Sequence, residues 1–210
     1  VSGELNGDDI CALREVLTKY KTLKNLDLFG ARIVSGGKAY LTTGSHEQIY
    51  TRDDEIGKYM FSNCTSLEKI TLPEHLKVIG IQAFANCSSL QWIEIPATVK
   101  SIDSQAFYSC TSMTFIGIPI DNSQLESIGP GAFSTSTVLD DLYIPSSVKD
   151  LSKLAFSPCR VRDLHVKWPT PPDVVITKQL AEGTLYVPKG CKAAYTADTN
   201  WGKFSRINEE

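Results

Sequence analysis

Apolar residues recur along most of the chain in a frame about 23 residues long. A typical copy begins with a phenylalanine, has a leucine six residues later, alternates two more apolar residues and then reaches a proline. Successive copies begin 23, 23, 26 and 23 residues apart, at Phe61, Phe84, Phe107, Phe133 and Phe156. A fixed period of this size predicts a solenoid, because one unit cannot bury its apolar side chains without stacked neighbours.

Each copy predicts one short strand followed by a compact return. In the first copy Leu67, Ile70 and Leu72 are the inward residues of a strand, and Pro73 ends it because proline has no N–H to donate to a neighbour. The same pattern recurs at 93–96, 116–119 and 142–145. The return adds a second inward position, filled by Ile79, Ile102, Ile128 and Leu151. We therefore expect a β-rich α/β fold, a solenoid of short parallel strands around one continuous core.

Both ends of the chain depart from the frame, as the capping units of a solenoid do. Asp8 or Asp9 is placed to cap a helix, and one face of that helix carries Ile10, Leu13, Val16, Leu17 and Tyr20. A strand with the repeat pattern is expected at 23–28, and residues 31–55 are about one unit of inserted chain.

Beyond residue 168 we expect a last strand at 185–187 and then a lid over the final rung, carrying Tyr195, Trp201, Phe204 and Ile207. The chain is thus predicted to be a single domain over 1–210. Residues 1–55 form the N-terminal cap and insertion, 56–168 the regular repeats and 169–210 the C-terminal cap.

Composition narrows the function classes. An apolar share of 42% in 210 residues is that of a folded protein, and a formal charge of −3 argues against nucleic-acid binding. No apolar run approaches the roughly 18 residues that span a bilayer. The chain begins at Val1 without a signal-like apolar segment. We therefore expect a trimmed or mature fragment, whose missing targeting signal carries no information.

Four cysteines occupy the same position of the frame, three residues after its phenylalanine: Cys64, Cys87, Cys110 and Cys159. Ser136 takes this place in the remaining copy, which favours small, buried, reduced side chains there. Adjacent rungs of a solenoid are also close enough for a disulfide, so bridged pairs stay open as the alternative. Metal ligands and other cofactors are not expected, because the chain has no Cys-x-x-Cys pair and its three histidines are scattered.

The outward positions of the strands form the candidate binding surface. Side chains that flank each central inward residue point to the opposite face of the sheet. There Trp92 and Phe115 should be neighbours across one rung, with Tyr143, His165 and Tyr186 on a nearby diagonal. The candidate ligand-binding residues are Trp92, Glu94, Phe115, Asp141, Tyr143, Asp163, His165 and Tyr186. Such a strip offers large contact area with few rotors. The alternatives are that these pairs only stabilise the sheet, or that the insertion covers them.

Catalytic motifs are missing from the sequence. It contains no Gly-x-Ser-x-Gly, His-Glu-x-x-His, phosphate-binding loop or dinucleotide fingerprint. A nucleophile, base and charge stabiliser that converge are what an enzyme requires, so the sequence favours a protein without catalytic activity.

The repeated frame, Phe-x-x-Cys-x-Ser-Leu-x-x-Ile-x-Ile-Pro followed by Val, Ile and Ala-Phe, resembles the BspA-like leucine-rich repeats of bacterial surface proteins. The resemblance covers residues 56–168 closely and extends to segments at 3–10 and 185–201. It implies a right-handed leucine-rich-repeat solenoid, export to the cell surface or the extracellular space, and adhesion or binding to host macromolecules.

The expected function is accordingly a non-catalytic extracellular module for protein interaction or adhesion. Its partner would be an extracellular or host protein whose identity the sequence does not contain. A glycan-binding module that uses the same strip, and a structural spacer within a larger surface protein, are the alternatives.

Overall fold

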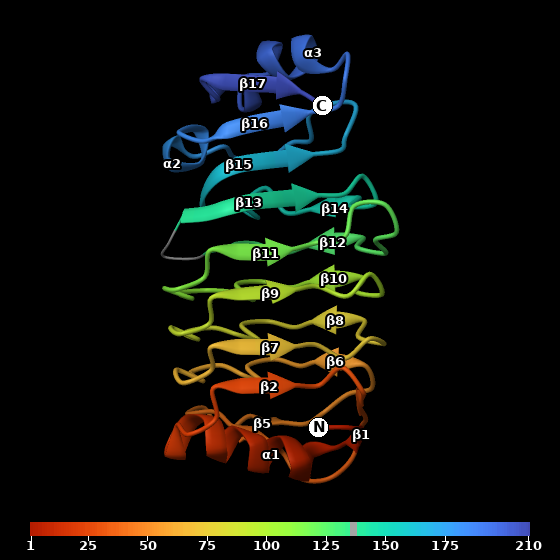
Figure 1. The fold of residues 1–210 in the computed structure, drawn as a ribbon, viewed down its shortest axis with the longest axis vertical. Coiled ribbons are helices and arrows are strands. Elements are labelled where there is room, and N and C mark those ends of the chain that lie inside the picture. The colour runs from red at the N-terminus through yellow and green to blue at the C-terminus, as the bar shows by residue number, and fades with distance from the viewer. Residues whose placement is uncertain (135–137) are drawn as a thin grey trace.

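The computed structural model describes residues 1–134 and 138–210, so the position of Ser136 lies outside the described residues. The chain forms the expected solenoid, with its repeats stacked along one axis (Figure 1). Strands in front run from left to right, the chain returns behind them, and each turn climbs toward the C-terminal end. This winding is right-handed, which confirms the predicted fold class.

One parallel sheet of eight strands runs the length of the molecule. Its strands are β2 (Asn25–Asp27), β7 (Lys69–Thr71), β9 (Trp92–Glu94), β11 (Phe115–Gly117), β13 (Val138–Ile144), β15 (Arg160–Val166), β16 (Thr184–Val187) and β17 (Arg206–Glu209). The register pairs equivalent residues of successive copies: Ile93 faces Ile116, and Ile116 faces Leu142. Identical rungs therefore place identical side chains in columns.

A second parallel sheet, which the sequence did not predict, lies in the returns. Its strands have two residues each: β6 (Glu55–Ile56), β8 (Val78–Ile79), β10 (Ser101–Ile102), β12 (Ser127–Ile128) and β14 (Asp150–Leu151). The second residue of each strand points inward; Ile79 and Ile102 are fully buried. The core is thus enclosed between two sheets.

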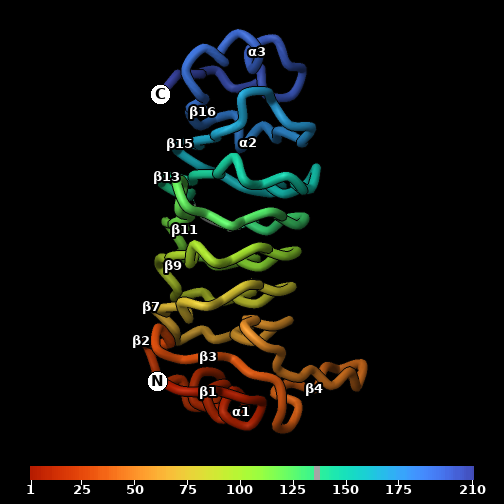
Figure 2. The backbone as a smooth tube through the Cα atoms, turned by 90° about the vertical axis from the view of Figure 1, so that its right-hand side faces the viewer, coloured from red at the N-terminus to blue at the C-terminus, as the bar shows by residue number. Residues whose placement is uncertain are grey.

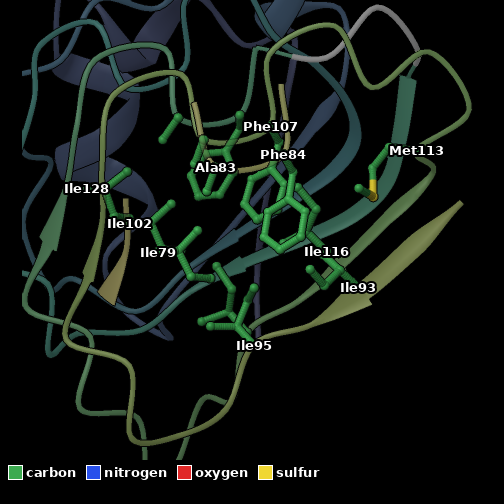
Figure 3. Packing of buried hydrophobic residues seen from close by; sticks show 14 of the residues in the cluster. Ile79, Ala83, Phe84, Ile93, Ile95, Ile102, Phe107, Met113, Ile116 and Ile128 are labelled. Atoms are coloured by element: carbon green, nitrogen blue, oxygen red, sulfur yellow. The ribbon is translucent and has the colours of Figure 1, made fainter. Parts of the chain in front are cut away.

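The frame phenylalanines form a ladder through that core, and Figure 3 shows two of its members, Phe84 and Phe107. The ring centroids of Phe61 and Phe84 lie 5.7 Å apart, those of Phe84 and Phe107 5.7 Å, and those of Phe133 and Phe156 6.0 Å, all stacked. All five rings are completely buried. Each ring fills the space between rungs, so neighbouring copies share one apolar interior.

The cysteine ladder consists of free thiols. Cys87 Sγ donates to the carbonyl oxygen of Phe61 at 3.0 Å, and Cys110 Sγ donates to that of Phe84 at 3.2 Å. Burial raises the pKa of Cys64, Cys110 and Cys159 to about 12. At neutral pH these thiols stay protonated and fill space in the core, and the Cys87 and Cys110 thiols also bind the backbone of the preceding rung.

The N-terminal cap differs in detail from the expectation. Helix α1 (Gly7–Glu15) begins after Asn6, which accepts from the backbone N–H of Asp8, while Asp9 accepts from the N–H of Asn6. The cap is therefore Asn6 within a capping box, not Asp8 or Asp9. One turn of π-helix, η1 (Val16–Tyr20), continues α1, and Tyr20 is 57% exposed instead of facing the core.

The insertion supplies two different structures. Strand β3 (Ala31–Ile33) pairs in parallel with β1 (Gly3–Leu5) and completes the cap. Strands β4 (Leu41–Thr42) and β5 (Gln48–Ile49) form an antiparallel hairpin. The hairpin projects from the side of the solenoid opposite the eight-stranded sheet (Figure 2), so it does not cover the predicted binding strip.

The C-terminal cap contains one strand more than expected. Short helices α2 (Lys178–Ala181) and α3 (Lys192–Ala197) and the 3-10 turn η2 (Trp201–Lys203) surround the last rungs. The strand predicted at 185–187 is present as β16, but it is not the last. Ile207, expected in a lid, lies in β17, which pairs with β16 through Leu185.

Candidate functional site

Trp92 and Phe115 lie side by side on the outer face of the eight-stranded sheet, as their register predicts. Both rings are partly exposed. The ammonium group of Lys69, one rung before, lies 4.8 Å from the centre of the Trp92 ring. The Phe115 ring leans over Gly117. A Cβ added to that glycine would come within 2.9 Å of Phe115 Cε1, so glycine leaves room for the ring. Phe115 thus reaches toward the neighbouring column of the face.

Tyr143, His165 and Tyr186 form a continuous stack in that neighbouring column. The ring centroids are 4.1 Å apart for Tyr143 and His165 and 4.4 Å for His165 and Tyr186. The three residues are direct register partners, so they form a straight row instead of a diagonal. His165 is only 7% exposed, which corrects the expectation of an open binding residue. The two tyrosines cover it and present their own rings.

The polar candidates lie around these rings. Asp141 and Asp163 are register partners on adjacent strands, both partly exposed, and Glu94 is exposed beside Trp92. Asp141 Oδ1 lies 3.7 Å from His165 Nε2. The predicted strip therefore divides into an open apolar part around Trp92 and Phe115 and a polar part around the tyrosine stack.

Glu210 completes the polar part, and the sequence had not indicated it. Glu210 Oε2 lies 2.8 Å from His165 Nδ1, and its Oε1 accepts from Lys167 Nζ at 2.7 Å. Although burial opposes its ionisation, the hydrogen bonds from Lys167 and His165 hold the pKa of Glu210 below its usual value. The charged carboxylate fastens the end of β17 onto β15.

Replacing Glu210 by glutamine should lower the free energy of unfolding by about 1 kcal/mol at pH 7, because the charge-assisted hydrogen bonds are lost. A carboxyl with a depressed pKa in the folded state stabilises above its unfolded pKa and loses that contribution as the pH falls. The difference from the parent protein should therefore shrink below about pH 4.5. Urea unfolding at pH 7 and pH 3.5 measures it. Glu182→Gln, at an exposed site, is the control; an equal E210Q difference at both pH values would contradict the assignment.

A groove of about 550 Å³ opens beside Trp92, at the carboxyl ends of β7 and β9. Phe29, which is 55% exposed, Pro96 and Pro119 line it together with Trp92. Glu74 and Glu94 lie at its rim. Phe29 lies outside the repeat frame and the prolines end strands, so the sequence pattern does not indicate their place in this groove. The groove extends the open apolar part beyond the strands themselves.

Within residues 1–134 and 138–210, no three histidine, cysteine or acidic side chains gather in a way that could hold a metal ion. In the same part of the chain, none of the helices is both long enough and apolar enough to cross a bilayer.

A right-handed stack of parallel rungs with an N-terminal helical cap defines a leucine-rich-repeat solenoid. Residues 54–169 match the family described as BspA type leucine rich repeat region, in six copies. The chain belongs to this family. Membership in a leucine-rich-repeat family suggests a protein-interaction module, a class whose members are typically non-catalytic binding scaffolds.

Two solved structures are similar to the chain. A leucine-rich repeat protein of T. pallidum is 23% identical, with a TM-score of 0.46, over 74% of this chain and 64% of that one. A leucine-rich repeat protein of Bacteroides ovatus is 17% identical, with a TM-score of 0.42, over 91% of this chain and 62% of that one. The chain thus spans less than two thirds of either protein. No curated protein matches it.

Proposed function

We propose that this chain is a non-catalytic extracellular module, on the cell surface or secreted, that binds an extracellular or host protein through the outer face of its eight-stranded sheet. One observation carries the proposal. Trp92 and Phe115 are partly exposed on a rigid sheet, while the hairpin of the insertion projects from the opposite side. Aromatic side chains in such a position supply much of the binding energy of protein interfaces at low entropic cost.

The surface suits a protein partner in its composition. An apolar centre, formed by Trp92, Phe115 and the adjoining groove, lies next to a polar rim that contains Asp141, Asp163 and Tyr186. Protein interfaces combine a desolvated aromatic centre with a hydrated polar edge. The sheet holds these side chains in fixed register, so little order must be gained on binding.

The test is a triple variant, Trp92→Ala with Phe115→Ala and Tyr143→Ala, measured by biolayer interferometry against a panel of purified extracellular-matrix and host-surface proteins. We expect affinity for any partner to fall at least tenfold, since each lost aromatic anchor costs on the order of 1–2 kcal/mol. Tyr20→Ala with Tyr108→Ala removes exposed aromatic rings that lie away from the face and is the matched control. A triple variant that binds like the control would exclude this face.

A glycan is the second candidate, and the groove beside Trp92 favours it. An open indole ring next to the carboxylates of Glu74 and Glu94 combines an apolar platform with hydrogen-bond acceptors, and a sugar ring requires both. A glycan array on which Trp92→Ala abolishes the signals would support this ligand over a protein. No binding in either screen would leave a structural spacer as the function.

A further inference from the structure

A trough runs along the outside of the second sheet, on the face where the hairpin projects. A hollow of about 670 Å³ lies between the hairpin β4–β5 and strands β6, β8 and β10. A second hollow of about 320 Å³ continues over β12 and β14. The two hollows share Ile81 and Asp103 and therefore form one elongated channel. The trough is remote from the sheet face of the proposed function and is not required by it.

The lining of the trough is partly apolar. Ile81 is 41% exposed and Tyr50, on the hairpin side, is 50% exposed. Gly80 lies where an added Cβ would come within 3.0 Å of the backbone of the preceding rung, so only glycine leaves the rungs this close.

The trough is also acidic. Its lining residues include four carboxylates, Glu47, Glu55, Asp103 and Asp150, against two cations, Arg52 and Lys58. Lys58 is already paired with Glu47 at 2.9 Å. In the described part of the chain, no basic nitrogen lies within ion-pair distance of Glu55, Asp103 or Asp150.

Glu55 and Asp103 are half-buried, and burial raises the pKa of both carboxyl groups. The charge of Arg52 opposes this rise in the pKa of Glu55, and the charge of Asp103 adds to it, so Glu55 and Asp103 interact across the trough. A cation placed between them would relieve both desolvation and repulsion.

The spacing of these carboxylates defines the shape of the ligand. Glu55, Ser101 and Asp150 share one register column, in which Ser101 is two strands from each of the other two. Asp103 lies on the rung of Ser101, two residues further along the chain. At about 4.8 Å per strand, the acidic rungs repeat about every 9.6 Å. A polyproline II helix advances about 9.3 Å per three-residue turn. A β-strand repeats its side chains about every 6.7 Å and does not match.

We propose that this trough binds an extended, polyproline II-like segment of a partner protein that carries arginine or lysine at every third position. The basic side chains pair with Glu55, Asp103 and Asp150, while the prolines between them lie on Ile81 and against Tyr50. A preformed polyproline helix loses little entropy on binding.

The test uses the whole chain and three fluorescent peptides. (Pro-Pro-Arg)₄ has the proposed spacing, (Pro-Arg)₄ has the same charge at a different spacing, and (Pro-Pro-Glu)₄ has the opposite charge. By fluorescence anisotropy at physiological salt, the first should bind at least tenfold more tightly than the second, and the third should not bind. Equal affinity for the two arginine peptides, or no binding of (Pro-Pro-Arg)₄, would overturn the proposal.

Variants locate the site. Glu55→Gln with Asp103→Asn should weaken (Pro-Pro-Arg)₄ at least tenfold, and the fold should be kept because neither carboxylate forms an ion pair. Glu4→Gln with Asp121→Asn removes two exposed charges outside the trough and should leave affinity unchanged. The triple aromatic variant of the sheet face should also bind the peptide normally, so failure of the two proposals can be told apart. If the control double variant lost as much peptide affinity as the trough double variant, the assignment of the site to the trough would be contradicted.

Discussion

Replacing Phe84 by alanine should lower the free energy of unfolding by about 3–5 kcal/mol, which is a large part of the stability of an ordinary domain. The Phe84 ring is fully buried and stacks on both Phe61 and Phe107 at 5.7 Å. Its removal leaves a cavity that rigid rungs on either side cannot fill. Urea unfolding followed by circular dichroism measures the change.

Phe29→Ala is the matched control for this variant. It makes the same chemical change at a side chain that is 55% exposed, and we expect it to alter stability by no more than about 0.5 kcal/mol. A Phe84→Ala effect below about 1 kcal/mol would show that the phenylalanine ladder is not what couples the copies.

The ladder was predictable because periodicity alone places equivalent residues in one column. Once rungs repeat every 23 residues, Phe61, Phe84 and Phe107 must occupy one place in successive turns. The same reasoning placed Trp92 beside Phe115. These predictions need only the repeat period and the alternation of inward and outward residues along a strand, and both can be recognised in the sequence.

The second sheet was not predictable in this way. Its strands have two residues each, as in Val78–Ile79 and Ser101–Ile102. Two residues show no alternation that could distinguish a strand from a turn. Their hydrogen-bonded pairing arises only when the rungs stack, so it is a property of the assembly and not of any one copy.

The sequence predicts on which face of the sheet the candidate site residues lie, but not how exposed each side chain is. Strand alternation correctly directs His165 to the outer face, yet Glu210, 45 residues away, lies against its ring. That contact depends on β17, whose sequence Arg-Ile-Asn-Glu has a single apolar residue and gives no strand signal. Long-range contacts of this kind determine which members of a column remain open to a ligand.

Under the two proposals made above, the two faces of the solenoid serve two kinds of recognition. The eight-stranded sheet would present aromatic rings, held in place by register, to a partner that offers apolar surface. The second sheet would present carboxylates on every second rung, half-buried at Glu55 and Asp103 and exposed at Asp150, to a partner that offers regularly spaced cations. In both cases the repeat sets the geometry, and the few residues that break the repeat, such as Trp92 and Asp103, provide the chemistry.

Trp201→Ala should cause a loss of stability similar in size to that of Phe84→Ala. This loss should be confined to the C-terminal cap. Trp201 is fully buried in the C-terminal cap, donates through Nε1 to the carbonyl oxygen of Pro172 at 2.7 Å and meets Tyr195 edge-on at 5.4 Å. We expect a loss of about 3–5 kcal/mol in the cap. Because each rung contacts mainly its neighbours, unfolding should begin at this end and spread inward.

Hydrogen exchange distinguishes a local effect from a global one. Amide protons of β16 and β17 should lose protection strongly in the Trp201→Ala variant, while those of β7 and β9 keep most of theirs. Trp92→Ala is the matched control, since it removes a partly exposed indole and should leave exchange in the cap unchanged. Equal loss of protection in all four strands would mean that the array unfolds as one cooperative unit, and that its caps do not act as separate ends.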